Sequence, residues 1–330
     1  MKAVVFHTKE KPLRVEEVDL PVPATGQVLI ALHYAALNHL DLWIWDEQSL
    51  DTPVISGADG SGVVHTVGNG VDERWIGKEV IINPALYWGN GEKVYAETFQ
   101  ILGNPTNGTF AEWITIPVDY ISEKPPHLSL KEAAALPLAA LTAYRALFTK
   151  AQLTPLDKVL ITGIGGGAAL YLLQMTVAIG ATVYVTSSSH EKLQKAVQWG
   201  AKDGYNYNDT GWVQKAKAAA GGFDVIIDSA GGNGFARLTE VANAGARIVL
   251  FGRTAGNINH LKPGLIFNKQ LQILGTVMGS PREFEAMLAF YCQHKLKPII
   301  DKEFALQDIN VAREYMRSGK HCGKIILNIR

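Results

Sequence analysis

The sequence predicts an α/β protein with two parts, a β-rich part and a doubly wound parallel sheet. Short β-prone runs separated by glycine and proline fill the first third of the chain. From residue 129 onward, apolar strands alternate with helices of about 10–15 residues, which is the pattern of parallel βαβ units. A length of 330 residues also favours two domains, at about 100–200 residues per domain.

The expected strands of the first part are residues 3–6, 28–32, 62–67 and 79–83. Their number and close spacing indicate a small β-barrel or a similar β-rich domain. Residues 84–108 interrupt this pattern with a polar, turn-rich insertion. A loop of this size is usually functional or forms a lobe of its own.

The second part begins with a helical segment over residues 129–148, which Pro137 divides into two helices. Strand and helix candidates then alternate, and at least five of them are strands. The tail carries helices near residues 283–294 and 308–317 and a closing strand over residues 324–329.

A final strand after a complete alternating unit indicates that the chain returns to its first part. We therefore expect a discontinuous first domain of residues 1–128 and 281–330. Residues 129–280 form the second domain in this prediction.

The composition excludes several classes of protein. With 47% apolar and 19% charged residues, the chain is too apolar for intrinsic disorder. It has 31 basic and 31 acidic residues, and this balance gives no electrostatic case for a nucleic-acid partner. Two cysteines cannot form a disulfide framework or a cysteine-rich zinc site.

The longest apolar stretches, residues 133–147 and 168–179, fall short of the about 18–20 residues that a membrane span requires. The apolar run at the N-terminus is too short for a signal-peptide core. We therefore expect a cytoplasmic protein that does not bind a membrane, keeps Cys292 and Cys322 reduced and acts on a small-molecule substrate.

A glycine-rich turn follows the first strand of the second part. Residues 159–168 read V-L-I-T-G-I-G-G-G-A, a G-x-G-x-x-A pattern at Gly163, Gly165 and Ala168. Gly163 permits a tight turn, Gly165 lets backbone N–H groups approach a pyrophosphate, and Ala168 lets helix and strand pack closely. Gly166 and Gly167 lead into the helix, whose N-terminus favours an anion. The pattern and its context predict dinucleotide binding, and a purely steric glycine turn is the alternative.

The end of the next strand bears on the choice between NAD and NADP. An NAD site places an acidic residue there for the ribose 2′-OH, but this strand ends in T-S-S-S with Ser187 at its second position. Hydroxyl groups and Lys192 can bind a 2′-phosphate, and Tyr207 can pack beside the adenosine. NADP (as NADPH) is therefore preferred and NAD remains open. The alternatives are a solvated lysine and a half-buried edge tyrosine.

Several motifs together resemble those of the medium-chain dehydrogenase/reductase superfamily. They are Asn38-x-x-Asp41, P-x-x-x-G-x-D-x-x-G over residues 53–62, L-P followed by L-T-A-Y over residues 136–144, and a closing G-K-I-I-L over residues 323–327. The chain is most similar to the quinone oxidoreductase-like branch, often catalogued as zinc-type alcohol dehydrogenase-like proteins. The resemblance implies a chaperonin-10-like (GroES-like) catalytic domain followed by a Rossmann domain.

The same resemblance identifies departures at the zinc sites. The first catalytic ligand, a cysteine in zinc alcohol dehydrogenases, falls at Asn38-His39, and the ligand histidine of the G-H-E motif falls at Ala58. The third falls at the apolar residues 138–139, and the insertion at 84–108 contains none of the four cysteines of a structural zinc lobe. His39, Asp41 and Asp59 are too few and lack the spacing of an alternative metal motif. We therefore expect no zinc.

By resemblance, Asn38 and Asp41 line the substrate side as the candidate catalytic residues, with Asn38 as a hydrogen-bond donor and Asp41 holding local structure. A helix or turn cap is the alternative for Asp41. The resemblance places Thr142 against the nicotinamide, with Phe251, Gly252 and Met278 beside its carboxamide and ribose. The residues Trp43, Trp45, Tyr87 and Trp88 form either an aromatic pocket wall or core packing.

These observations predict a zinc-independent, NADPH-dependent oxidoreductase that transfers hydride to quinones or α,β-unsaturated carbonyls. One alternative is an NAD(P)-dependent alcohol or aldehyde dehydrogenase that holds a metal through unrecognised ligands. Another is a cofactor-binding protein with negligible turnover, because fold does not fix function. By family analogy we also expect a homodimer joined through the edge strand near residues 272–278.

Overall fold

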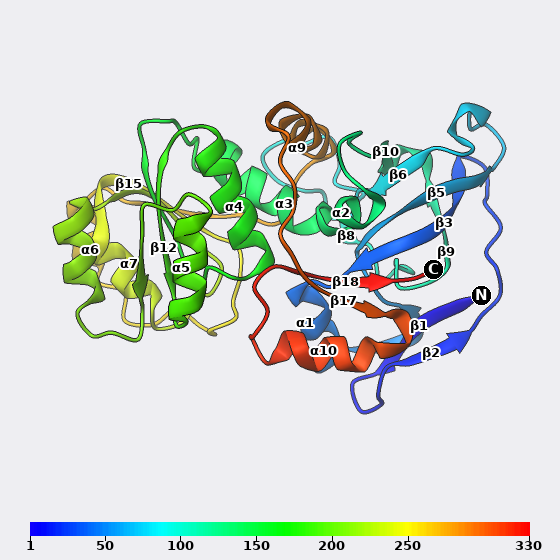
Figure 1. Cartoon of the computed structure of the whole chain (residues 1–330), viewed down its shortest axis with the longest axis horizontal. Helices are drawn as coiled ribbons and strands as arrows, with labels where there is room; N and C mark the ends of the chain where they lie inside the picture. The colour runs from blue at the N-terminus through cyan, green and yellow to red at the C-terminus, as the bar shows by residue number, and fades with distance from the viewer. The chain divides into compact units, whose positions relative to one another are not determined.

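The computed structural model describes the backbone of residues 1–330 and the side chains of residues 1–48 and 52–330. The chain divides into two compact units. The first combines residues 1–141 with residues 279–330, and the second consists of residues 142–278 (Figure 1). Residues from both ends of the chain thus belong to the first unit.

The first unit is built around a seven-stranded sheet of order β10-β6-β5-β3-β18-β17, with β9 also paired to β3. A three-stranded sheet of order β2-β1-β4 and a two-stranded β7-β8 pair complete its β-structure. The strands of its N-terminal segment are β1 (Lys2–Thr8), β2 (Arg14–Glu17), β3 (Gln27–Ala36), β4 (Ser49–Ile55), β5 (Asp59–Val67), β6 (Glu79–Ile82), β7 (Ala85–Leu86), β8 (Gln100–Ile101), β9 (Trp113–Pro117) and β10 (Ile121–Glu123).

The C-terminal segment adds two strands and two helices to this unit. Strand β18 (Lys324–Asn328) pairs antiparallel with β3 and parallel with β17 (Ile300–Ala305). The helices are α9 (Pro281–His294) and α10 (Ile309–Arg317), close to the ranges that the sequence predicts. Helix α9 starts at Pro281, two residues before the predicted range, because Ser280 caps it and Glu283 completes a capping box. Strand β17 was not predicted.

Residues 129–141, which the sequence analysis assigns to the second domain, lie in the first unit. They form α2 (Leu130–Ala135) and the start of α3 (Pro137–Tyr144). The Ser61 hydroxyl on β5 donates to the Leu130 carbonyl at 2.6 Å, which ties α2 to the main sheet. Pro137 divides the two helices, as predicted.

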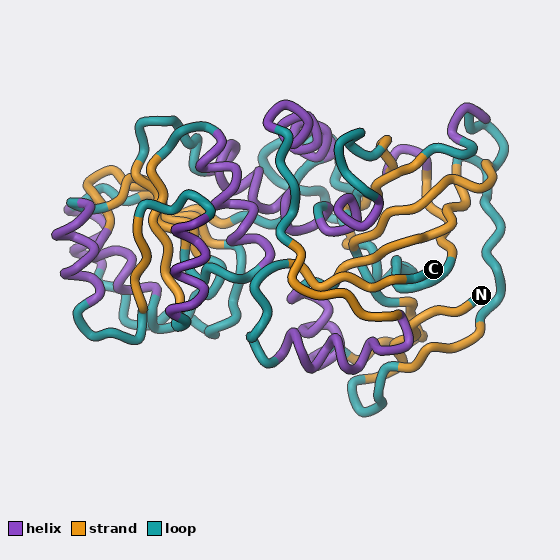
Figure 2. The backbone as a smooth tube through the Cα atoms, viewed as in Figure 1, coloured by secondary structure: helices purple, strands orange, loops and turns teal.

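The second unit contains a six-stranded parallel sheet of order β13-β12-β11-β14-β15-β16, which confirms the predicted doubly wound fold. Figure 2 shows its strands in orange among purple helices. The strands are β11 (Lys158–Ile161), β12 (Thr182–Ser187), β13 (Asp203–Asn206), β14 (Phe223–Asp228), β15 (Ala242–Leu250) and β16 (Gln272–Gly275). The helices are α4 (Gly167–Ala178), α5 (His190–Gln198), α6 (Trp212–Ala220), α7 (Phe235–Val241) and α8 (Pro263–Asn268), and Arg145–Lys150 forms a π-helical turn.

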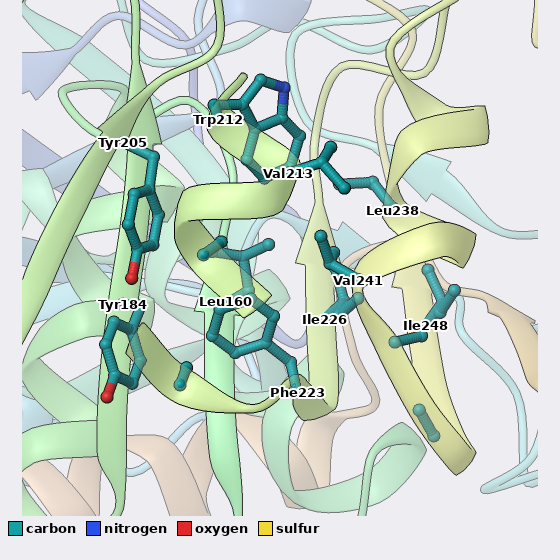
Figure 3. Packing of buried hydrophobic residues seen from close by; sticks show 14 of the residues in the cluster. Leu160, Tyr184, Tyr205, Trp212, Val213, Phe223, Ile226, Leu238, Val241 and Ile248 are labelled. Atoms are coloured by element: carbon teal, nitrogen blue, oxygen red, sulfur yellow. The ribbon is translucent and has the colours of Figure 1, made fainter. Parts of the chain in front are cut away.

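Helices α6 and α7 cover one face of this sheet with a large apolar core (Figure 3). Tyr184 and Tyr205 on adjacent strands stack with ring centroids 6.2 Å apart, and Phe223 meets Tyr184 edge-on at 5.4 Å. Trp212 and Val213 of α6 close the cluster. Helix α6 was not predicted, although its alanine- and lysine-rich sequence has high helix propensity.

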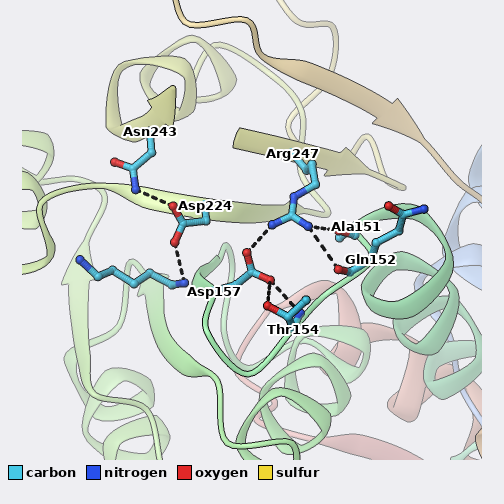
Figure 4. Close-up of polar contacts among 8 residues, drawn as sticks. Ala151, Gln152, Thr154, Asp157, Asp224, Asn243 and Arg247 are labelled. Carbon is cyan, nitrogen blue, oxygen red and sulfur yellow. Dashed lines mark hydrogen bonds and ion pairs between the residues drawn. The ribbon is translucent and has the colours of Figure 1, made fainter. Parts of the chain in front are cut away.

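Polar contacts hold the parallel strands together at the end of the sheet where the strands begin (Figure 4). Arg247 on β15 pairs with Asp157 just before β11 and donates to the carbonyl of Ala151 at 2.7 Å. Asp224 accepts from the Lys158 N–H at 2.9 Å and from the Asn243 side chain at 2.7 Å. These bonds tie β11, β14 and β15 together at the edge opposite to their carboxyl ends.

Candidate active site

The glycine turn lies between β11 and α4, as predicted. Gly163 and Gly165 have φ values of 66° and 117°, in the left-handed region that favours glycine. The turn is anchored by the Ile164 N–H, which donates to the Thr186 carbonyl at 2.8 Å. Gly166 is the N-cap of α4 and Gly167 is its first residue, so the backbone N–H groups of the first turn face a potential anion.

Asp228, at the end of β14, supports this turn from the neighbouring strand. It accepts from the Thr162 hydroxyl at 2.6 Å and from the Gly231 N–H at 2.7 Å. Burial raises the pKa of its carboxyl, and these hydrogen bonds lower it. Sequence reasoning did not single out Asp228, although an acid that ends an apolar strand next to a glycine pair is a usable signal.

Ser187, Lys192 and Tyr207 lie together at the carboxyl end of β12. The buried Ser187 hydroxyl accepts from the Ser189 N–H at 3.2 Å, and the Tyr207 N–H donates to the Ser187 carbonyl at 3.3 Å. Lys192 reaches back over the glycine turn, because a Cβ on Gly165 would lie 2.5 Å from its Cδ and 3.1 Å from its Nζ. The structure thus brings a lysine, a serine and the glycine turn to one place.

The residues predicted for the nicotinamide end come from three segments of the chain, namely α3, the residues after β15 and the residues after β16. Phe251 and Gly252 follow β15, and a Cβ on Gly252 would meet the Ser229 carbonyl oxygen at 2.1 Å. Met278 is buried with a φ of 37°, and Thr142 is buried in α3. Their contact with a cofactor stays a prediction.

One further observation in the second unit fits a bound dinucleotide. The Thr276 hydroxyl, just past the end of β16, is buried without a hydrogen-bond partner. A buried polar atom without a partner is costly, so a bound ligand is a natural acceptor or donor for it. With the glycine turn after β11 and Lys192 in the first turn of α5, which follows β12, polar groups gather at the carboxyl ends of the strands, where dinucleotides bind in this class of fold. Sequence reasoning missed Thr276.

A buried polar cluster in the first unit surrounds the side chain of Lys324. Its Nζ atom donates to the Leu37 carbonyl at 2.8 Å, to Asn38 Oδ1 at 2.7 Å and to Asp59 Oδ2 at 2.9 Å. Asn38 Nδ2 donates to the same Asp59 oxygen at 2.9 Å. The residues Asn38, Asp59 and Lys324 are 5%, 0% and 3% exposed, so this is a nearly dry network.

The strand order brings these three residues together. Strand β3 lies between β5 and β18, and its last residue, Ala36, is opposite Asp59 on one side and Ile326 on the other. Asn38 follows the end of β3, Asp59 begins β5 and Lys324 begins β18. One polar side chain therefore lies at or just beyond the end of each of three neighbouring strands, all at the same end of the sheet.

Asp59 and Asp41 complete the cluster. The second oxygen of Asp59 accepts from the Leu138 N–H at 2.8 Å, at the start of α3, where a helix N-terminus favours a carboxylate. Asp41 lies in α1 (His39–Glu47) and accepts from the Asn38 N–H at 2.7 Å. Burial raises the pKa of the Asp41 carboxyl to about 7; the Asn38 hydrogen bond opposes this rise, Asp59 adds to it and Lys324 opposes it.

Asp41 is the N3 residue of the capping box of α1 and binds the Asn38 N–H, which is the capping role that the sequence analysis gave as its alternative. The place of Asn38 and Asp41 on the substrate side stays a prediction. Sequence reasoning missed the role of Lys324. The signal was present, because Lys324 directly precedes the apolar run Ile325–Leu327 in the closing strand, and a buried lysine requires acceptors.

A catalytic zinc does not fit the side chains at this place. Zinc needs three protein ligands of the Cys, His, Asp or Glu type and an open position. Ala58 offers no ligand atom, and the amide of Asn38 already binds Lys324 and Asp59. In residues 1–48 and 52–330, the structure places no three His, Cys, Asp or Glu side chains together as a metal site.

Aromatic packing organises the insertion at residues 84–108. Trp88 is 1% exposed, and its Nε1 donates to the Gly91 carbonyl at 2.9 Å. The ring of Trp88 lies 5.8 Å from that of Tyr95 and 5.3 Å from that of Phe99. This aromatic cluster holds the lobe from within.

The other aromatics divide between packing and surface. Trp45 is buried and donates to the Ser56 hydroxyl at 3.0 Å, so both it and Trp88 pack in the interior. Tyr87 is 45% exposed, and Trp43 packs edge-on against His39 at 5.7 Å.

Within the described part of the chain, every helix is too short or too polar to cross a membrane.

Two family models match separate parts of the chain. Residues 24–126 match the alcohol dehydrogenase GroES-like domain, and residues 167–293 match the zinc-binding dehydrogenase family. The chain is 34% identical to the zinc-type alcohol dehydrogenase-like protein YogA of Leptosphaeria maculans, with 96% of this chain and 95% of that protein covered. It is 30% identical to an NAD-dependent alcohol dehydrogenase of Sulfolobus acidocaldarius over the full length of both.

Solved structures of alcohol dehydrogenases are also similar to the whole chain. A crystal structure of an NAD-dependent alcohol dehydrogenase superposes with a TM-score of 0.94 at 33% identity, covering 100% of both chains. A cobalt- and zinc-bound thermostable alcohol dehydrogenase of Pyrobaculum aerophilum superposes with a TM-score of 0.88 at 27% identity, covering 100% of this chain and 99% of that one.

Proposed function

Since this chain belongs to the zinc-type alcohol dehydrogenase family of the medium-chain dehydrogenase/reductase superfamily, it is a nicotinamide-dependent oxidoreductase, and we propose that it reduces conjugated carbonyl compounds with NADPH. The family assignment includes a GroES-like N-terminal domain and a six-stranded Rossmann sheet. The proposal adds the substrate class, quinones or α,β-unsaturated carbonyls, the preference for NADPH and the independence from zinc.

The observation that carries the proposal is the cluster of Asn38, Asp59 and Lys324. Asn38 and Ala58 stand at positions where the resemblance puts zinc ligands, and the Asn38 amide is bound to a lysine and a carboxylate. Without a Lewis acid, reduction depends on positioning and on hydrogen-bond donors at the oxygen that gains charge. Conjugated carbonyls suit such a site because delocalisation spreads the developing charge.

The nicotinamide supplies the hydride when the cofactor is bound. The chain's own residues hold and orient it. The N–H groups at Gly165–Gly167 would receive the pyrophosphate, and Ser187 and Lys192 would favour a 2′-phosphate. On the substrate side, Asn38 donates to the carbonyl oxygen as negative charge develops there.

An alcohol dehydrogenase using NAD or NADP is the second candidate. Relatives with that activity in their names match the full length of this chain at 30% identity and above, in sequence and in structure. The two candidates differ in direction and in metal use. An alcohol dehydrogenase of this type would reduce NAD⁺ or NADP⁺ with simple alcohols.

The test is a panel of quinones, enones, aldehydes and alcohols assayed through the absorbance of the nicotinamide. We expect NADPH oxidation with quinones or enones, and a loss of activity in Asn38→Ala with little change in the control Asn328→Ala. Asn328 is a suitable control because it binds Glu303 outside the cluster. Turnover of alcohols alone would support the second candidate. Cofactor binding without turnover of any compound would favour a non-catalytic, cofactor-binding protein.

We further propose a homodimer formed through β16. This strand ends the order of the six-stranded sheet, and Ile273 on it is 39% exposed. A second copy related by a two-fold axis would pair the two edges. Light scattering of the purified protein tests this, and a monomeric mass at micromolar concentration would contradict it.

A further inference from the structure

We propose that Lys324 is a positioning residue that makes Asn38 the hydrogen-bond donor for the substrate's carbonyl oxygen. This inference rests on the proposed function, since it concerns the carbonyl that the enzyme reduces. In this inference the buried ammonium group of Lys324 polarises the substrate carbonyl indirectly, through the amide of Asn38.

The charges around Asn38 fix the orientation of its amide. An ammonium group can only donate hydrogen bonds and a carboxylate can only accept them. The oxygen of the Asn38 amide therefore faces Lys324 at 2.7 Å, and its nitrogen faces Asp59 at 2.9 Å. A flipped amide would place two donors together at Lys324 and two acceptors together at Asp59, so only one orientation is stable.

Lys324 itself has no hydrogen to offer a substrate. Its three N–H bonds go to the Leu37 carbonyl, the Asn38 amide oxygen and the Asp59 carboxylate, at 2.7 to 2.9 Å. The group is 3% exposed. Its influence on a substrate must therefore pass through a neighbour.

Asn38 is that neighbour. Its Nδ2 atom carries two hydrogens, and among the hydrogen bonds of the described residues only the one to Asp59 uses them. The residue Asn38 is 5% exposed, whereas Asp59 is fully buried. The second hydrogen of Asn38 is thus the donor that the cluster leaves available.

The ammonium makes this hydrogen a stronger donor. A cation on the amide oxygen withdraws electron density from the amide nitrogen, and hydrogen bonds in series reinforce one another in a low dielectric. The donor is also preorganised, so it costs no reorientation when charge develops on the substrate oxygen. Asp59 balances the lysine charge and accepts from Asn38, Lys324 and the Leu138 N–H.

The arrangement also limits which substrate oxygen suits this site, because Asn38 offers it a hydrogen-bond donor and no free acceptor. The Asn38 oxygen is occupied by Lys324, and its free hydrogen can only donate. The cluster therefore fits an acceptor oxygen, as in an enone, an aldehyde or a quinone.

The test uses the full-length protein with bound NADP⁺, which cannot deliver hydride, and 4-(dimethylamino)cinnamaldehyde as the probe. The absorption band of this conjugated aldehyde moves to longer wavelength when its oxygen accepts a hydrogen bond. We expect a red shift with the natural protein, loss of the shift in Asn38→Ala and a smaller shift in Lys324→Met. Lys302→Met is the matched control, because Lys302 is an exposed lysine on the neighbouring strand β17, and it keeps the full shift.

Because Lys324→Met leaves a buried carboxylate unpaired, Asp59→Asn/Lys324→Met serves as a second, uncharged variant. We expect it to lower kcat for NADPH-dependent reduction at least tenfold, with the KM for NADPH unchanged. The two substitutions add little to the loss caused by Asn38→Ala, because both act through one hydrogen bond.

The inference is overturned if the folded double variant keeps the red shift and kcat of the natural protein. It is also overturned if combining the double variant with Asn38→Ala lowers kcat by the product of the two separate losses. Failure of the proposed function looks different. In that case the natural protein does not oxidise NADPH with any conjugated carbonyl, or it loses both the red shift and this activity when 1,10-phenanthroline removes a metal.

Discussion

The Nζ atom of Lys324 lies 2.9 Å from the Oδ2 atom of Asp59, and the two side chains are 3% and 0% exposed. The two residues are 265 positions apart in the chain. They meet because β18 and β5 flank β3 in one sheet. A fixed buried ion pair thus stands beside Asn38, where the family resemblance puts the first zinc ligand.

Removing one member of this pair should destabilise the first unit strongly. Lys324→Met leaves the Asp59 carboxylate buried without its cation, and such a change typically costs about 3–5 kcal/mol. The double variant Asp59→Asn/Lys324→Met should recover most of this loss, as measured by urea unfolding.

Lys78→Met is the control for that measurement. Lys78 pairs with Glu123 at 3.1 Å, but the side chains are 46% and 62% exposed. Exposed pairs contribute about 0–1 kcal/mol. A loss for Lys324→Met no larger than that of the control would show that the buried pair is not held as described.

Asp41 should make stability depend on pH. Its pKa is about 7 in the folded protein, against about 3.9 for an unperturbed aspartate. The folded state therefore holds this proton more tightly, so the stabilising contribution is complete below pH 4 and is lost as pH rises to about 7. Relative to Asp41→Asn, the free energy of unfolding should fall by up to about 1.4 kcal/mol per pH unit in that range.

The comparison with Asp41→Asn removes the contribution of the other titrating groups. Asparagine keeps an oxygen that accepts the Asn38 N–H. Parallel stability curves for the two proteins between pH 5 and 8 would mean that Asp41 titrates near its ordinary value.

Lys192→Ala should weaken NADPH binding much more than NADH binding. Lys192 lies over the glycine turn, beside the end of β12, where a 2′-phosphate would bind. Loss of one charge-assisted bond corresponds to roughly a tenfold weakening or more. Fluorescence titration with both cofactors measures this.

Lys195→Ala is the matched control for Lys192→Ala. Lys195 is on the same helix, one turn further on, and pairs with Glu191 at 2.7 Å. Equal weakening of NADPH and NADH in Lys192→Ala would remove the argument for a 2′-phosphate site.

Trp88→Ala should loosen the lobe of residues 84–108. Trp88 is 1% exposed and contacts Tyr95 and Phe99, and truncating a buried tryptophan typically costs about 3–5 kcal/mol. Limited proteolysis should cut the variant within the lobe at concentrations that leave the natural protein intact. Equal resistance of both proteins would place the stability of the lobe elsewhere.

The sequence was sufficient for features that depend on local patterns. The parallel sheet was predicted from alternating apolar strands and helices, and the glycine turn from its spacing after a strand. Both are confirmed as structure. Pro137 and the caps around Ser280 and Glu283 fixed helix ends for the same local reason.

Other features depend on partners far away in the chain. Strand β17 alternates polar and apolar residues only weakly, and it forms by pairing with β18. The hydrogen bonds of Lys324 also depend on distant partners, since its three acceptors belong to Leu37, Asn38 and Asp59. A pattern within one segment carries no information on such a contact.

The sequence analysis assigned residues 129–141 to the second domain, whereas they lie in the first unit, and the reason is related. Helix propensity identifies α2 but not the sheet on which it packs, and the Ser61 bond to Leu130 ties it to the first unit.

The central claim is that hydride transfer by this protein does not require a metal at Asn38. The most direct measurement is NADPH oxidation with a conjugated carbonyl, before and after treatment with 1,10-phenanthroline, together with the zinc content per chain. We predict undiminished activity with far less than one zinc per chain. One zinc per chain whose removal abolishes the activity, and whose return restores it, would contradict the claim.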